Sequence, residues 1–147
     1  MNEFSIVIPA YNESENLVVL IEEIFSSIDN SKNKFEVIIV DDCSNDDTQS
    51  KISTYIKNYN LVYLKNKINL GQSKSIYTGI KNAKFSNIVT IDGDLQNDPK
   101  DINILCHFYF SDINYGLVSG VRIKRKDNMT KVISSKIANS IRSYILK

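Results

Sequence analysis

The sequence predicts one α/β domain, built on a mostly parallel sheet with helices on both faces. Short apolar runs rich in β-branched residues alternate with segments whose apolar residues recur at helical spacing. The strand-like runs are apolar throughout, which is typical of strands covered on both faces of a parallel sheet. The length of 147 residues suits one domain and is sufficient for a hydrophobic core.

The elements follow one another as repeated strand and helix units, which favours parallel pairing with helical crossovers. Strands are expected at residues 4–10, 35–42, 61–66, 87–92 and 115–121. Helices are expected at residues 12–28, 44–59, 71–83 and 100–110. Asn12 with Glu15, and Ser44, are expected to cap the first two helices, where Asp46 and Asp47 also favour the positive N-terminal end. Pro99 is expected to open the fourth helix.

The C-terminal end of the sequence is strongly basic. Residues 121–147 hold eight Lys or Arg residues and one Asp, although the whole chain has a formal net charge of +1. Apolar residues recur there every four positions, at Met129, Ile133, Ile137, Ile141 and Ile145. This pattern predicts a basic amphipathic helix. We therefore divide the chain into a core at 1–120 and a basic segment at 121–147, and expect the sequence to stop before a C-terminal membrane region.

Several classes of protein are disfavoured by what the sequence lacks. It has neither the ~20 consecutive apolar residues of a membrane helix nor a signal peptide, which favours a cytoplasmic location. Cys43 and Cys106 lack metal-ligand spacing, so we expect two reduced thiols. His107 is expected to be a packing residue. No GxxxxGKS or GxGxxG motif is present, which disfavours P-loop hydrolysis and dinucleotide binding.

Acidic residues gather where the predicted strands end. Glu13 follows the first strand, Asp41 and Asp42 end the second, and Asp92 and Asp94 follow the fourth. Ligands of open α/β sheets bind at this edge. Two carboxylates two positions apart on an extended segment would repel by a few kcal/mol at about 5 Å. A divalent cation such as Mg²⁺ or Mn²⁺ would turn that repulsion into attraction, so the pair predicts a metal site.

Four segments in order carry a resemblance to a known family. They are VIPAYNE at 7–13, VDDCSNDDT at 40–48, NLGQSKSIYTG at 69–79 and DGDLQNDP at 92–99. Together they resemble the inverting glycosyltransferases of family 2, which have the Rossmann-like GT-A fold. The later segments GVRIKRKD at 120–127 and SKIAN at 135–139 are most similar to the polyprenyl-phosphate sugar transferases, the dolichol-phosphate mannose synthase group.

The resemblance implies metal-dependent transfer, with inversion, of a sugar from a UDP- or GDP-linked donor to a polyprenyl phosphate. It assigns the nucleotide pocket to Pro9, Ala10, Tyr11, Glu13, Asp41 and Asp42. It assigns the Mg²⁺ or Mn²⁺ ion to Asp92, Asp94 and Gln96. It assigns catalytic contacts to Asp94, Arg122, Lys131 and Ser135. Two departures stand out, because Cys43 replaces the usual Gly and Lys131 stands where close relatives tend to have Arg.

Alternative functions remain open at this point. One is a family 2 transferase that acts on a saccharide hydroxyl in cell-surface polysaccharide synthesis, and another is a non-catalytic fragment that binds a nucleotide sugar. An acceptor phosphate is already ionised at neutral pH and needs no general base, in agreement with the lack of a suitable histidine.

The basic segment has two interpretations, a solvated helix packed on the domain or a helix lying on anionic lipid. A polyprenyl substrate favours the second, on the cytoplasmic side of the membrane. Nucleic acid is disfavoured because no aromatic platform accompanies the charge. An oligomer is compatible with a parent protein that is anchored in the membrane.

Overall fold

The computed structural model describes residues 1–112 and 114–121. Its sheet has four strands in the order β3-β2-β1-β4, and every pairing is parallel. The strands are β1 (Asn2–Ala10), β2 (Asn33–Asp41), β3 (Leu61–Lys65) and β4 (Ile88–Thr90). The helices are α1 (Ser14–Ser27), α2 (Thr48–Ile56), α3 (Gln72–Asn82) and α4 (Asp101–Ser111). The predicted parallel α/β fold is confirmed.

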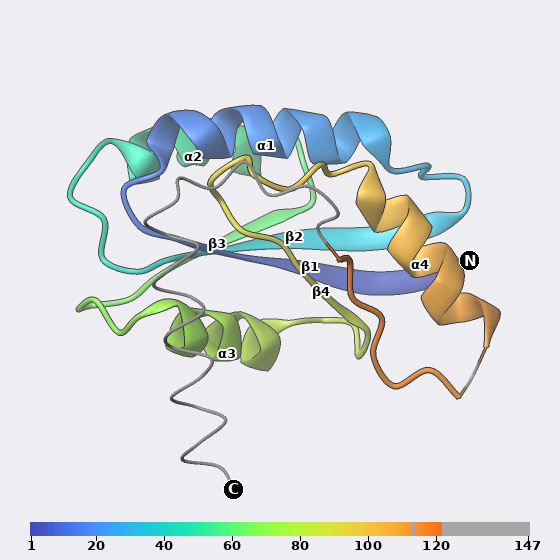
Figure 1. Ribbon diagram of the computed structural model, residues 1–147. Coiled ribbons are helices and arrows are strands. Elements are labelled where there is room, and N and C mark those ends of the chain that lie inside the picture. The colour runs from blue at the N-terminus through green and yellow to red at the C-terminus, as the bar shows by residue number, and fades with distance from the viewer. Residues whose placement is uncertain (113, 122–147) are drawn as a thin grey trace, which may run out of the picture.

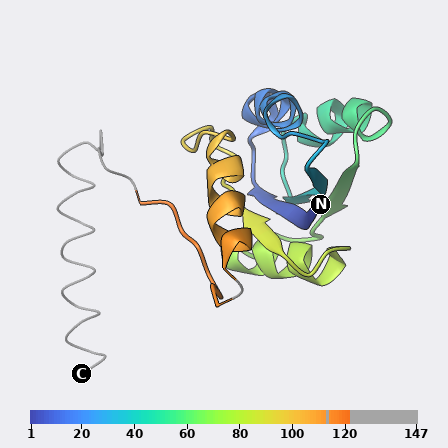
Figure 2. The same cartoon turned by 90° about the vertical axis from the view of Figure 1, so that its right-hand side faces the viewer.

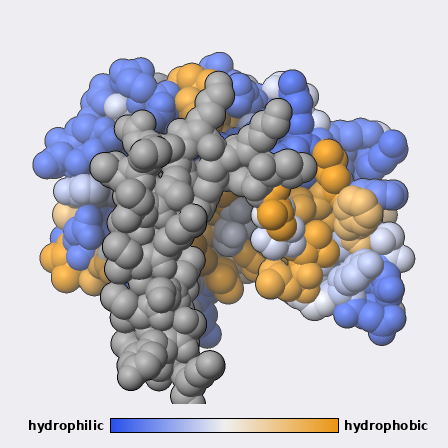
Figure 3. Space-filling view, viewed as in Figure 1, coloured by the Kyte–Doolittle hydropathy of each residue, from blue (hydrophilic) through white to orange (hydrophobic). Residues whose placement is uncertain are grey.

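Helices cover both faces of the sheet, as predicted. Helices α1 and α2 lie on one face and α3 lies on the other, whereas α4 lies beside the β4 edge (Figures 1 and 2). Alternation along β1 divides the core, because Ile6 and Ile8 pack toward α1 whereas Val7 joins the cluster on the other face. Ile102 and Cys106 bring α4 into the core, and burial raises the pKa of the Cys106 thiol to about 11. Apolar side chains also gather on the surface over α4 (Figure 3).

A buried polar pair fastens the end of α3 to the sheet. The Ser5 hydroxyl donates to Glu36 Oε1 at 2.6 Å, and the same oxygen accepts the backbone N–H of Lys84 at 2.6 Å. The Ser5 hydroxyl oxygen accepts the N–H of Phe85 at 3.2 Å. These contacts satisfy polar groups that would otherwise be costly to bury.

The predicted fifth strand is wrong. Residues 115–121 are described and form no strand. Leu117 and Val121 are 84% and 85% exposed, so the apolar residues that suggested a buried strand contact no sheet. Gly116 and Gly120 weaken any strand preference in this run. Its apolar content was therefore a misleading signal.

The predicted caps of the first two helices are also wrong. Asn12 has a φ of +57°, and its side-chain oxygen accepts the backbone N–H of Asn45 at 3.0 Å. The Ser44 hydroxyl oxygen accepts the N–H of Asn12 at 2.9 Å. Each polar side chain therefore braces the other loop, and neither caps its own helix.

Asp46 does lie at a helix N-terminus, as predicted, and it serves two helices. Its carboxylate accepts the N–H of Thr48 at 3.1 Å and that of Ser14 at 3.2 Å. It therefore ties the starts of α2 and α1 together.

The basic segment lies outside the described residues. This applies to Arg122, Lys131 and Ser135 and to the predicted amphipathic helix. Within residues 1–112 and 114–121, no helix is long and apolar enough to cross a bilayer.

Helix α3 approaches the sheet at a glycine. A Cβ atom added at Gly79 would lie 2.4 Å from Val7 Cγ1 and 3.2 Å from Val40 Cγ2. Because both valines are fully buried, position 79 can carry no side chain unless α3 moves away from β1 and β2.

We expect Gly79→Ala to destabilise the protein. Overpacking a core costs about 1–3 kcal/mol, which outweighs the gain of up to ~1 kcal/mol in helix propensity. Urea unfolding would measure the change. Gly116→Ala is the matched control, since its Cβ would meet no atom within 4 Å. An unchanged midpoint in Gly79→Ala would contradict the close approach of α3 to the sheet.

Candidate functional site

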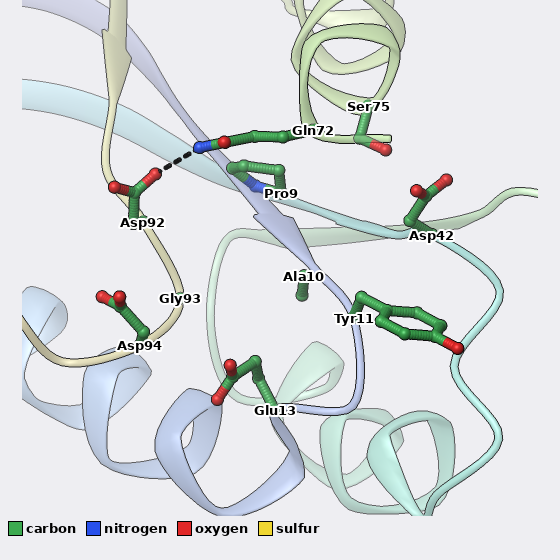
Figure 4. A pocket seen from close by; sticks show the side chains of 10 residues that line it. All are labelled: Pro9, Ala10, Tyr11, Glu13, Asp42, Gln72, Ser75, Asp92, Gly93 and Asp94. Atoms are coloured by element: carbon green, nitrogen blue, oxygen red, sulfur yellow. Dashed lines mark hydrogen bonds between the residues drawn. The ribbon is translucent and has the colours of Figure 1, made fainter. Parts of the chain in front are cut away.

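A polar pocket lies at the carboxyl ends of the strands. Its volume is about 270 Å³. It is lined by Pro9, Ala10, Tyr11, Glu13, Asp42, Gln72, Ser75, Asp92, Gly93 and Asp94 (Figure 4). The acids predicted to meet at this edge do so, with the exception of Asp41. Residues from α3 line one side of the pocket and the start of α1 lies on the other (Figure 4).

Asp42 is a buried carboxylate that holds the loop before α3. Its Oδ1 accepts the Asn66 side-chain N–H at 2.7 Å and the Leu70 backbone N–H at 2.9 Å. Its Oδ2 accepts the Gly71 backbone N–H at 2.6 Å. Burial alone would raise the pKa of Asp42, but these hydrogen bonds outweigh it and the net pKa is lowered. Gly71 has a φ of +85°, which glycine adopts without strain.

Asp41 does not line the pocket, although the resemblance assigned it there. Its side chain is fully buried and accepts the Ser44 backbone N–H at 2.7 Å. It also accepts the Tyr63 hydroxyl hydrogen and lies 3.4 Å from Lys65 Nζ. Burial, followed by the bond to Asp41, raises the pKa of Tyr63. Since neighbouring side chains on a strand point to opposite sides, only one of two consecutive acids can reach the pocket.

The turn that Asp41 closes contains Cys43. This residue has a φ of +67°, a conformation that glycine adopts most easily. The observed backbone therefore explains why a glycine is usual at this place in the resembling family. Cys43 preserves the turn at some cost in strain.

The first pocket wall comes from the end of β1. Pro9 and Ala10 are buried, and Tyr11 is 47% exposed with its ring on the Asp42 side of the pocket (Figure 4). Glu13 Oε2 accepts the Asn16 side-chain N–H at 2.5 Å, which fixes the carboxylate at the start of α1. The wall thus offers an aromatic face beside a carboxylate.

The second wall carries the DGD segment that follows β4. Asp92 is half-buried and Asp94 is exposed. Asp94 Oδ1 accepts the Gln96 backbone N–H at 3.1 Å within a turn in which Leu95 has a φ of +59°. A Cβ at Gly93 would lie 3.4 Å from the Pro9 carbonyl oxygen. The Gly93 backbone therefore lies close to the end of β1, and so do Asp92 and Asp94 on either side of it.

Asp92 and Asp94 are the members of the predicted metal site that line the pocket. Gln96 is exposed and is not among the residues that line the pocket, and its role as a metal ligand stays a prediction. Within residues 1–112 and 114–121, no group of three or more His, Cys, Asp or Glu side chains could hold a metal. Two carboxylates with water and phosphate oxygens fit Mg²⁺ or Mn²⁺, which commonly complete their coordination in this way.

Sequence reasoning missed two pocket residues. Gln72 and Ser75 lie on α3, and Gln72 Nε2 donates to Asp92 Oδ1 at 2.7 Å (Figure 4). Both belong to the segment NLGQSKSIYTG, which was matched to the family without a role for either. Gln72, Ser75 and Gly79 are three and four residues apart, which places them on one side of α3. This helical spacing could have indicated that Gln72 and Ser75 share the side of the helix that faces the sheet.

A parallel α/β sheet with a polar, acid-lined pocket at its carboxyl edge defines a class of ligand-binding α/β domains. Comparison with known proteins identifies the family within this class. The family model "Glycosyl transferase family 2" matches residues 5–146, and the chain belongs to that family.

Curated relatives point to one group within the family. An undecaprenyl-phosphate 4-deoxy-4-formamido-L-arabinose transferase of Pectobacterium atrosepticum is 34% identical over 138 residues, which are 92% of this chain and 41% of the relative. The enzyme of the same name from Proteus mirabilis is 31% identical over 143 residues, which are 96% of this chain and 43% of the relative. The chain therefore spans about two fifths of the length of these relatives.

Solved structures share the fold. The mannosyltransferase PcManGT of Pyrobaculum calidifontis, in complex with GDP-Man and Mn²⁺, has a TM-score of 0.70 at 22% identity over 81% of this chain and 35% of its own. TarS of S. aureus has a TM-score of 0.66 at 23% identity over 85% of this chain and 40% of its own. Both are neighbours in fold, and the expected GT-A architecture is confirmed.

We expect Asp42→Asn to lower stability most at neutral pH. The replacement sets an amide N–H₂ against a backbone N–H, and lost hydrogen bonds to a charged group cost about 1.5–3 kcal/mol. Because the folded pKa is lowered, the contribution of Asp42 is present above its ordinary value of 3.8 and is lost as the pH falls through the folded value. Urea unfolding at pH 7 and at about pH 3 would measure the difference.

The control for this prediction is Glu23→Gln, which changes an exposed carboxylate on α1. It should unfold like the parent protein at both pH values. If Asp42→Asn is as stable as the parent at pH 7, the assigned role of the carboxylate is wrong.

Proposed function

We propose that the chain is the donor-binding core of a glycosyltransferase that moves a sugar from a nucleoside diphosphate sugar to a polyprenyl phosphate, with inversion. The observation that carries this proposal is the pocket in which Asp92 and Asp94 face a wall formed by Tyr11 and Asp42. Family membership and relatives named as undecaprenyl-phosphate transferases support the reaction and the acceptor class. The proposal concerns the whole protein, of which this chain contains the donor side.

The two walls suit the two halves of a nucleotide sugar. The nucleoside would lie along Pro9, Ala10 and Tyr11, where the aromatic ring and the apolar wall can contact a base. Asp42 accepts hydrogen bonds from Asn66, Leu70 and Gly71, and the Ser75 hydroxyl also lowers its pKa, so it would have little acceptor capacity left for the nucleoside. Asp41 would act indirectly, by holding the turn after β2. The fold neighbours were solved with GDP-Man in one case and with UDP-GlcNAc in another, and both bases remain compatible with the pocket.

The diphosphate would lie beside Asp92 and Asp94, with Mg²⁺ or Mn²⁺ held between its oxygens and the two carboxylates. When bound, the ion offsets the negative charge that develops on the leaving diphosphate. The Mn²⁺ in the PcManGT complex supports this choice of ion. Gln96 would stabilise the turn through its backbone N–H, which holds Asp94 Oδ1.

The acceptor side is proposed from sequence. Arg122, Lys131 and Ser135 would contact phosphate groups, and the basic segment would lie on anionic lipid at the cytoplasmic side of the membrane. The pocket of about 270 Å³ is slightly smaller than the ~300–1,000 Å³ usual for ligand sites. We therefore place the acceptor-binding groups further along the chain.

We expect Asp94→Asn to abolish metal-dependent binding of the donor diphosphate. The change removes one of two negative charges that the ion needs, while the amide keeps the volume of the side chain. Isothermal titration with UDP and with GDP, each with and without Mn²⁺, would measure it. Asp98→Asn, which lies outside the pocket, is the control. If the Mn²⁺-dependent affinity is unchanged in Asp94→Asn, its role as a ligand is wrong.

The acceptor class can be tested directly. With radiolabelled nucleoside diphosphate sugars, we expect the protein to transfer label to undecaprenyl phosphate and not to saccharide acceptors. The extraction of label into organic solvent would measure transfer. Transfer to saccharides alone would show that the hydroxyl-directed alternative is correct. Donor binding without any turnover would identify the chain as a binding fragment.

A further inference from the structure

We infer that Gln72 is a positioning residue, whose side-chain amide sets the orientation of Asp92 toward the cation and the donor diphosphate. This inference rests on the proposed function. It adds a residue that the family resemblance did not assign.

The contact joins two elements that are far apart in the sequence. Gln72 is the first residue of α3, and Asp92 follows β4. Gln72 Nε2 donates to Asp92 Oδ1 at 2.7 Å across the pocket (Figure 4). The amide is therefore the direct link between the α3 wall and the acidic wall.

The backbone that carries Gln72 is fixed on both sides. Immediately before it, the Gly71 N–H is bound by Asp42 Oδ2 at 2.6 Å. Two turns further along α3, Gly79 lies against Val7 and Val40. Because its backbone is anchored in this way, the Gln72 side chain can hold the Asp92 carboxylate in one orientation.

The chemistry of an amide suits this task better than that of a lysine. A neutral N–H donor restricts the Asp92 carboxylate without cancelling the charge that a cation needs. It engages one oxygen, Oδ1, and leaves Oδ2 for the ion. Asp94 is held in the same way, because its Oδ1 accepts the Gln96 backbone N–H at 3.1 Å. Each acid thus has one oxygen bound by the protein and one that can serve a ligand.

The decisive variant is Gln72→Met, which keeps the length and helix preference of the side chain and removes its donor. We expect its affinity for Mn²⁺ in the presence of inorganic pyrophosphate to fall about 10–100-fold, the usual effect of losing a group that orients a metal ligand. Electron paramagnetic resonance of free Mn²⁺ measures this without turnover. Gln49→Met is the matched control, since Gln49 is exposed near the start of α2 and lies outside the pocket.

A second comparison separates positioning from direct coordination. In an Asp92→Ala background, measured at raised Mn²⁺ concentration, Gln72→Met should have no further effect, because Gln72 acts through Asp92. An equal loss in both backgrounds would overturn the inference, since Gln72 would then contact the ion or the diphosphate itself. Unfolding curves of Gln72→Met that match those of the parent protein would show that the loss is not a folding defect.

The outcomes also distinguish this inference from the proposed function. If Asp92→Ala and Asp94→Asn weaken Mn²⁺ binding while Gln72→Met does not, the positioning role of Gln72 is wrong and the metal site stands. If none of the three variants changes Mn²⁺ binding, the metal site fails, and the role of Gln72 fails with it.

Discussion

The pocket depends on one buried carboxylate, that of Asp42. It follows directly after β2 and accepts hydrogen bonds from the Leu70 and Gly71 backbone, so it joins the edge of the sheet to the start of α3. A buried charge is tolerated only when it is well hydrogen-bonded, and the lowered pKa of Asp42 shows that these bonds more than offset the desolvation. These bonds fix the end of the loop that leads into Gln72 and Ser75, two residues that line the pocket.

Helix α3 is held against the sheet at both ends and in its middle. Asp42 fixes its N-terminal end, Gly79 brings it onto Val7 and Val40, and Glu36 binds the Lys84 N–H just beyond its C-terminal end. On the opposite face, α1 is held by an apolar core and by the Asp46 carboxylate at its start. Tight packing of α3 on one side of the sheet and of α1 on the other leaves the strand ends between them as the place for a ligand.

The sequence predicted the parallel α/β architecture, four of its strands and most of the pocket, because these follow from repeated local patterns. Buried strands show as continuous apolar runs, and the ends of parallel strands meet at one edge, so Glu13, Asp42, Asp92 and Asp94 could be grouped without coordinates. The sequence did not predict where individual side chains point. Asp41 turns into the protein and Asn12 serves a neighbouring loop, and both depend on contacts between residues distant in sequence. The apolar run at 115–121 shows that strand-like composition is not enough without a partner strand.

Acidic and basic residues are divided between two parts of the chain. Residues 1–120 carry most of the acids, and those at the strand ends attract a cation but repel a phosphate. Residues 121–147 carry eight bases and one acid. In the proposed function, a cation held by Asp92 and Asp94 would offset the charge of these two carboxylates and allow a diphosphate to lie beside them, while basic groups from the later segment would attract a second phosphate toward it. The acidic and basic parts of the chain would then have complementary tasks, because a glycosyl transfer between two phosphates would require both of them.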